Sequence, residues 1–146
     1  MRTLLGAATI LNGILAGATA DRFLIGIPAF RKLGPVIWGE YSRHADLTPA
    51  GAAFYPTLAI GGTTLTIADA VRRRRPIVSL AAASALAGLL FTFKAAPNML
   101  AVRHLGDDAD ALQRRMDDFV HWSTLRGALQ FAAFLACVCA LSEDRA

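Results

Sequence analysis

Charged and amide side chains interrupt the apolar runs of this 146-residue chain at a few points, and these residues are the first candidates for chemistry. Arg126 and Gln130 lie inside one apolar run, Lys94 lies near the end of another, and Asp21 follows the first. An Arg in hydrocarbon costs ~2.5–3.5 kcal/mol on insertion scales, so ionisable residues in such runs usually have a function. Because a facing carboxylate would lower this cost, we predict that Asp21 pairs with Arg126. The pair would belong to a site or would fix helix register.

These candidates come to one depth if the apolar runs are helices that cross a membrane. At that depth His121 or Asp21 would serve as a general base. Arg126, Lys94 and Asn98 would donate hydrogen bonds to the oxyanion that forms when the base removes a proton. The sequence therefore predicts a polar cluster between the helices. Its catalytic residues would be His121, Arg126, Asn98 and Asp21, and its substrate-binding residues would be Lys94, Trp122, Tyr55 and Gln130.

Histidine residues offer a metal site as an alternative. His44, His104 and His121 all fall on one predicted side of the membrane, with carboxylates nearby, and three His with a carboxylate could hold a metal ion. No two of these His share a helix at ligand spacing, so we predict no metal and no cofactor, and the histidine site remains an open alternative. The sequence has no Gly-rich phosphate loop and no Cys-His nucleophile pair.

A run of four Arg, residues 72–75, separates two apolar runs and orients the chain. Clustered Arg in a short loop marks the cytoplasmic side of a membrane. Each flanking run is about as long as the ~20 residues that a helix needs to cross the bilayer. The sequence therefore predicts a multi-pass cell-membrane protein with both termini in the cytoplasm. The four predicted spans are residues 3–20, with an extension to 30, and residues 52–71, 76–100 and 119–141.

The predicted fold is all-α: an antiparallel bundle of four transmembrane helices in a single domain, residues 1–146. We expect a short interfacial helix at 36–44, within the first outer segment 29–50, and a helix over 109–118 that runs into the fourth span. Pro56 is expected in the first turn of the second span, where Pro is tolerated.

Composition limits the partners. Charged residues make up 18% of the chain, below the average of about a quarter, and hydrophobic residues make up 55%. The positive charge is therefore better explained by membrane topology than by nucleic acid. We expect membrane lipid and a hydrophobic aromatic molecule as partners, with a homo-oligomer as an option. The first apolar run, followed by Ala18-Thr19-Ala20, also fits a cleaved signal peptide, and this alternative stays open.

Short motifs at the ends of the apolar runs resemble those of the anthrone-oxygenase-like family of small four-helix membrane proteins. The resemblance covers most of the chain, and its more specific points are Asn98 and Arg126. One position differs, because Ser123 stands where family members often carry His or Asn, with His121 two residues earlier. The motifs are Pro28-Ala29-Phe30, Trp38, Tyr41-Ser42-Arg43-His44-Ala45-Asp46-Leu47, Tyr55-Pro56, Lys94-Ala95-Ala96-Pro97-Asn98 and Trp122-Ser123-Thr124-Leu125-Arg126.

The resemblance implies an enzyme that oxidises a hydrophobic phenolic or anthrone-type substrate with molecular oxygen and without an evident cofactor. The competing hypothesis is a non-catalytic membrane protein that binds lipid or a small molecule, or that serves as an accessory subunit. An enzyme needs an enclosed pocket lined by the polar cluster. A tightly packed bundle with a self-satisfied cluster would favour the structural role.

Overall fold

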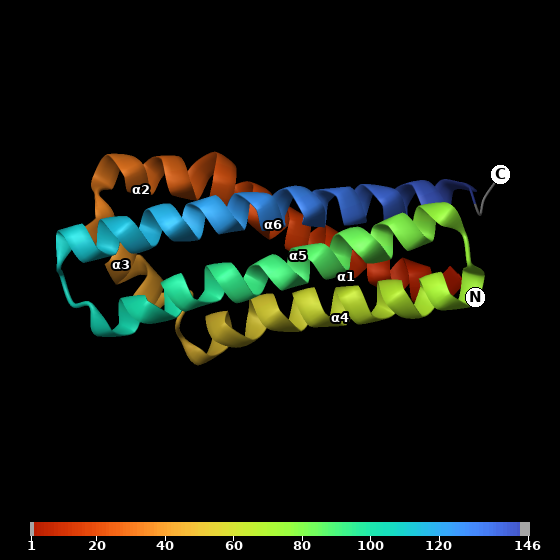
Figure 1. Ribbon diagram of the computed structural model, residues 1–146, viewed down its shortest axis with the longest axis horizontal. Helices are drawn as coiled ribbons and strands as arrows, with labels where there is room; N and C mark the ends of the chain where they lie inside the picture. Colours follow the sequence, from red (N-terminus) through yellow and green to blue (C-terminus); the bar gives the residue numbers. More distant parts are fainter. Residues whose placement is uncertain (1, 144–146) are drawn as a thin grey trace.

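The computed structural model describes residues 2–143, and this part of the chain is helical almost throughout (Figure 1). It contains no strand, so the all-α prediction is confirmed for the described residues. The elements in chain order are α1 (Arg2–Asp21), the π-helical turn η1 (Arg22–Gly26), α2 (Ile27–Leu33), α3 (Pro35–His44), α4 (Pro49–Arg73), α5 (Pro76–Ala101), the 3₁₀ turn η2 (Val102–His104) and α6 (Ala109–Glu143).

Local sequence signals explain where the helices begin and end. Gly34 has a φ of 98°, which L side chains rarely adopt, and Pro35 then opens α3. Thr48 caps α4, because its Oγ1 accepts a hydrogen bond from the backbone N–H of Gly51 at 3.2 Å. Asp108 does the same for α6 through the N–H of Ala111, at 3.0 Å. The observed helices α3 and α6 confirm the helices predicted at 36–44 and 109–118.

Pro56 occupies a different position from the expected one. α4 begins at Pro49, three residues before the predicted span, so Pro56 lies about two turns inside the helix rather than in its first turn. The helix starts early because Thr48 supplies a cap and Pro49 fits the first helical position.

Three helical segments of the described chain are long and apolar enough to cross a membrane: Thr3–Leu33, Pro76–His104 and Ala109–Glu143. The first includes α1, η1 and α2, so the first apolar run continues as one helical segment through the predicted extension. α4 does not meet the same criterion of length and composition. The structure is thus compatible with a membrane protein.

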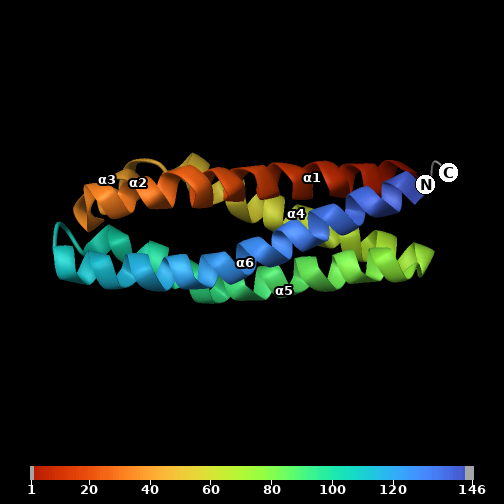
Figure 2. The same cartoon turned by 90° about the horizontal axis from the view of Figure 1, so that it is seen from above.

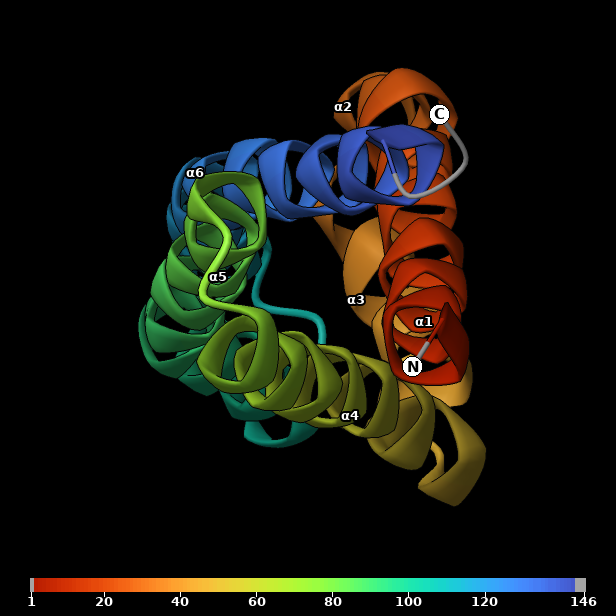
Figure 3. The ribbon, with the colours of Figure 1, turned by 90° about the vertical axis from the view of Figure 1, so that its right-hand side faces the viewer.

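The long helices α1, α4, α5 and α6 lie side by side around a common axis (Figures 2 and 3). α1 packs against α4 and α6, and α5 packs against the same two helices. Leu5 of α1, Val78 of α5 and Cys137 of α6 belong to one buried apolar cluster, which places these ends together. We call this end, which includes residues 72–75, the basic end.

The opposite end contains α3 and is called the α3 end. Trp38 is 2% exposed and packs with Met99, Leu112 and Phe119 from the ends of α5 and α6. Arg43 of α3 donates hydrogen bonds to Gly106 O at 2.9 Å and to an Asp107 carboxylate oxygen at 3.0 Å. It also bonds Glu40, and this hydrogen bond lowers the pKa of the Glu40 carboxyl. α3 is therefore fixed across the ends of α5 and α6.

Buried polar side chains connect α1 to its neighbours. Asn12 donates a hydrogen bond to Thr66 Oγ1 of α4 at 3.0 Å, and Thr19 donates one to Gln130 Oε1 of α6 at 3.0 Å. Glycine permits the close approach at both contacts, because a Cβ on Gly62 would lie 3.1 Å from Asn12 and one on Gly127 would lie 2.9 Å from Thr19.

Candidate functional site

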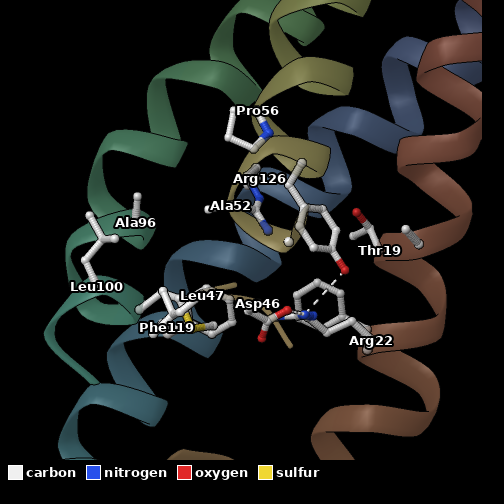
Figure 4. Close-up of a pocket in the computed structure, with 15 residues that line it drawn as sticks. Thr19, Arg22, Asp46, Leu47, Ala52, Pro56, Ala96, Leu100, Phe119 and Arg126 are labelled. Carbon is white, nitrogen blue, oxygen red and sulfur yellow. Dashed lines mark hydrogen bonds and ion pairs between the residues drawn. The ribbon is translucent and has the colours of Figure 1, made fainter. Parts of the chain in front are cut away.

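A cavity of about 320 Å³ lies between the helices near the α3 end (Figure 4). Most of its lining is apolar, with a few polar groups, as is usual for small-molecule sites. We call it the polar cavity, because its charged lining residues are Arg22, Asp46 and Arg126. The other lining residues are Ala18, Thr19, Phe23, Leu47, Gly51, Ala52, Tyr55, Pro56, Ala96, Met99, Leu100 and Phe119.

Arg22 and Asp46 form an ion pair on the wall of the polar cavity (Figure 4). Their side chains are 15% and 8% exposed, so the pair is largely withdrawn from solvent. The Arg22 guanidinium also donates to the Tyr55 hydroxyl at 3.4 Å and lies over the Tyr55 and Phe119 rings, 5.3 and 5.7 Å from their centroids. These contacts hold Arg22 in place and keep the Asp46 carboxylate compensated.

Asp46 keeps one carboxylate oxygen available. Its Oδ1 accepts the hydrogen bond from Arg22, whereas its buried Oδ2 has no hydrogen-bond partner among the described residues. A buried polar atom without a partner costs ~1–3 kcal/mol, so it indicates either a strained position or a place where another molecule binds.

Arg126 is the second unsatisfied group of the cavity. It projects from α6, and its buried Nε has no hydrogen-bond partner among residues 2–143. No carboxylate of the described chain forms an ion pair with it. Since Arg keeps its charge at any physiological pH, the two Arg and one Asp of the cavity together carry a net positive charge. This excess positive charge would favour a negatively charged or acidic group in the cavity.

The phase of α1 explains why Arg22, and not Asp21, enters the cavity, because Arg22 lies three and four positions after the lining residues Thr19 and Ala18. A π-helical turn then follows at Arg22–Gly26. The N–H of Ile27 bonds to the carbonyl of Arg22, five residues back, which widens the helix at this point. Pro28 follows immediately, and its ring would clash with the carbonyl of Leu24 in a regular α-helix. The widened turn thus relieves a strain that the sequence creates.

A second cavity of about 270 Å³ adjoins the first. We call it the apolar cavity, because its walls are mainly aliphatic and aromatic. It shares four lining residues with the polar cavity: Tyr55, Pro56, Ala96 and Arg126. The remaining ones are Leu15, Ala59, Ile60, Leu89, Thr92, Phe93 and Gln130.

The structure brings three of the sequence-predicted site residues together. Arg126 and Tyr55 line both cavities, and Gln130 lines the apolar one, where it is buried and hydrogen-bonded to Thr19. This group corresponds to part of the predicted polar cluster.

The predicted pair of Asp21 and Arg126 was wrong. Asp21 is exposed, lines neither cavity and forms no ion pair with Arg126. The carboxylate that faces the cavity is Asp46, whereas Asp21 lies ~100° around the helix from Arg22, on the outer surface.

The predicted base His121 also lies away from the cavities. Its side chain is exposed, and its ring packs edge-on against Trp122 with a centroid separation of 4.9 Å. Trp122 in turn stacks on Phe91 at 6.0 Å and lines neither cavity. Trp122 lies one turn before Arg126 on α6, whereas His121 is rotated away from that face.

Lys94 and Asn98 lie outside the cavities as well. Lys94 is exposed. Asn98 is buried, but its Oδ1 accepts a hydrogen bond from Arg115 at 3.0 Å and its Nδ2 donates to the Lys94 carbonyl at 3.1 Å. Asn98 therefore connects α5 to α6 rather than facing the polar cavity.

The three His are not brought together as a metal site. Within residues 2–143 no group of three or more His, Cys, Asp or Glu side chains is placed to hold a metal ion. His44 instead lies against Glu40 of its own helix, at 3.2 Å.

Sequence reasoning missed Arg22, Asp46 and Thr19 as cavity residues. Thr19 and Arg22 are three positions apart and so share a helix face, which could have singled out Arg22. Asp46 lies in the connection between α3 and α4, and no local pattern signals which way such a side chain points.

No protein-family description, curated protein or solved structure matches this chain. The resemblance to the anthrone-oxygenase-like family therefore stays a prediction from short motifs, and function has to be argued from the cavity.

Proposed function

We propose that this protein is a multi-pass membrane protein that binds a hydrophobic small molecule with one acidic oxygen in the polar cavity. The observation that carries the proposal is Arg126, a cation in a largely apolar cavity for which residues 2–143 supply neither an ion-pair partner nor a hydrogen-bond partner for its Nε. A ligand oxyanion would compensate this charge, while the surrounding apolar groups would cover the rest of the ligand.

The proposal includes four transmembrane helices in antiparallel order, with both termini in the cytoplasm. Support for α4 as the fourth span comes from its 25 residues, ~37 Å of helix, and from its packing between α1 and α5. Support for the orientation comes from residues 72–75, which lie at the same end as Leu5 and Cys137. The polar cavity would then lie near the outer boundary of the membrane.

Binding of a compact phenol to the purified protein in lipid nanodiscs tests the proposal. Equilibrium dialysis of 4-ethylphenol against empty nanodiscs separates binding from partition into lipid. We expect Arg126→Gln to weaken binding at least about tenfold, because hydrogen bonds to charged groups are worth ~1.5–3 kcal/mol. The matched control is Arg114→Gln, an exposed Arg on the same helix, which should bind like the unchanged protein. Equal affinity for both variants would overturn the proposal.

A catalytic role is the second candidate, and the unpaired Oδ2 of Asp46 favours it. In this reaction the Asp46 carboxylate removes an acidic C–H proton from an anthrone-type substrate, and Arg126 stabilises the enolate oxygen that results. Molecular oxygen then oxidises the carbanion, so that one anthrone and one O₂ give one anthraquinone and one water. Asp46 replaces His121 and Asp21 as the proposed base, since both of those side chains lie outside the cavity.

The absorbance of anthraquinone distinguishes the two candidates. Turnover of anthrone in air that exceeds empty nanodiscs, and that Asp46→Asn abolishes while 4-ethylphenol still binds, would support the enzyme. Binding without turnover would leave the non-catalytic alternative.

A further inference from the structure

The apolar cavity has no role in holding an acidic oxygen, yet it is continuous in its walls with the site that does. Tyr55, Pro56, Ala96 and Arg126 line both spaces, so the two cavities adjoin at these side chains. The charged groups Arg22 and Asp46 line only the first space, and Leu15, Leu89 and Phe93 line only the second. The two together form a receptacle that is polar at one end and apolar at the other.

The length of the apolar part can be read from its walls. On α5 its lining runs from Ala96 to Leu89, which corresponds to ~10 Å of helix, and on α4 it reaches Ile60. This length is comparable with that of an extended octyl chain. Arg126 stands at the junction, where it could meet the polar head of a molecule whose apolar body continues into the second cavity.

Two lining residues also reach the outer surface of the bundle. Ile60 of α4 is 54% exposed and Phe93 of α5 is 71% exposed, although both line the apolar cavity. The cavity therefore extends to the surface between α4 and α5. In a membrane-spanning bundle this surface faces lipid, so the apolar end of the receptacle communicates with the bilayer rather than with water.

We propose that the ligand is an elongated acidic amphiphile, with its oxygen at Arg126 and Asp46 and its apolar chain in the apolar cavity, reached from the bilayer between α4 and α5. This proposal rests on the proposed function and specifies the shape of its ligand. It assigns to the second cavity the selection of chain length. A ligand that used the polar cavity alone would gain nothing from a chain.

A filled apolar cavity tests the assignment. Ala59 is 8% exposed and lines only the apolar cavity, so Ala59→Leu should exclude the chain. We expect this variant to bind 4-octylphenol at least about tenfold more weakly, while 4-ethylphenol binding changes by less than about twofold, because the apolar area that the chain would bury is lost. Ala53→Leu, an exposed position on the same helix, is the matched control and should change neither.

The outcomes separate this inference from the proposed function. If Ala59→Leu leaves 4-octylphenol binding intact, the inference that the ligand is an elongated amphiphile is wrong. The proposed function would still stand if 4-ethylphenol binding depends on Arg126. If 4-ethylphenol binding does not depend on Arg126, the proposed function itself is wrong.

Photolabelling keeps the test decisive if Ala59→Leu does not fold. A 4-octylphenol with a diazirine at the end of its chain should label the unchanged protein on peptides that contain Leu89 or Phe93, and excess 4-octylphenol should block the label. Label at Leu47 or Leu100 of the polar cavity, or no blockable label, would overturn the inference.

Discussion

Arg22 at the end of α1 and Asp46 in the connection between α3 and α4 are ion-paired across 24 positions of sequence. The pair connects the two ends of the chain segment formed by η1, α2 and α3, which lies at the α3 end. It also sets the charge of the polar cavity, because it neutralises one guanidinium and leaves the other, that of Arg126, without a counter-ion.

Removing the carboxylate of this pair should destabilise the protein strongly. Asp46→Asn leaves two guanidinium groups without compensation in the cavity, and breaking one side of a buried pair costs ~3–5 kcal/mol. Thermal unfolding in one fixed detergent measures the effect. Asp107→Asn is the control, because that side chain is 75% exposed and its pair with Arg43 should contribute little. The double variant Arg22→Met/Asp46→Leu should regain most of the stability. Equal melting temperatures for Asp46→Asn and Asp107→Asn would contradict the role of the pair.

We expect the charge of Arg126 to lower the free energy of unfolding of the ligand-free protein. An unpaired cation in a largely apolar cavity is unfavourable, so we expect Arg126→Met to raise the free energy of unfolding by ~1–2 kcal/mol while it weakens phenol binding. The comparison is between thermal unfolding and dialysis of the same preparation. A variant that loses stability as well as binding would indicate that Arg126 has a structural partner, and the ligand argument would fail.

The contact between α6 and α1 at the cavity should tolerate no added methyl group. A Cβ on Gly127 would lie 2.9 Å from the Thr19 methyl carbon and 3.1 Å from the Phe23 ring. We expect Gly127→Ala to destabilise by ~1–3 kcal/mol, because Thr19 is branched and cannot move away without breaking its bond to Gln130.

Gly17→Ala is the matched substitution for that test. Nothing lies within 4 Å of the added methyl group, so the change should be neutral or stabilising by up to ~1 kcal/mol. Similar losses of stability in the two variants would show that helix propensity, and not the close approach of α1 and α6, decides the result.

Topology can be checked by labelling single cysteines in intact cells with a maleimide that does not cross membranes. Ser142→Cys at the basic end should be protected, and Asp107→Cys at the α3 end should react, in a background where Cys137 and Cys139 are replaced by Ala. Neither change alters the Arg run that sets the orientation. Reaction of Ser142→Cys alone would place the basic end outside and reverse the proposed orientation.

Sequence by itself determined the helices of this protein. Apolar runs and polar connections predict where most helices lie, because capping and backbone preferences act over a few residues. The predicted start of α4 is residue 52 instead of Pro49, since the prediction leaves out the cap that Thr48 provides. Sequence also singled out Arg126 and Gln130, since a charge or an amide within an apolar run is conspicuous without any knowledge of packing, and it singled out Tyr55 by its place near the end of an apolar run.

Only the tertiary structure decided which of these side chains meet. Asp21 and Arg22 are neighbours in sequence, and the rotational setting of α1 in the bundle determines that Arg22, rather than Asp21, enters the cavity. Asp46 reaches Arg22 because α3 folds back across the ends of α5 and α6, a path that depends on the packing of Trp38 against distant residues. A helix face rotates by ~100° per residue, so a shift of one position moves a side chain from a cavity to the surface, and no pattern along the chain records that phase.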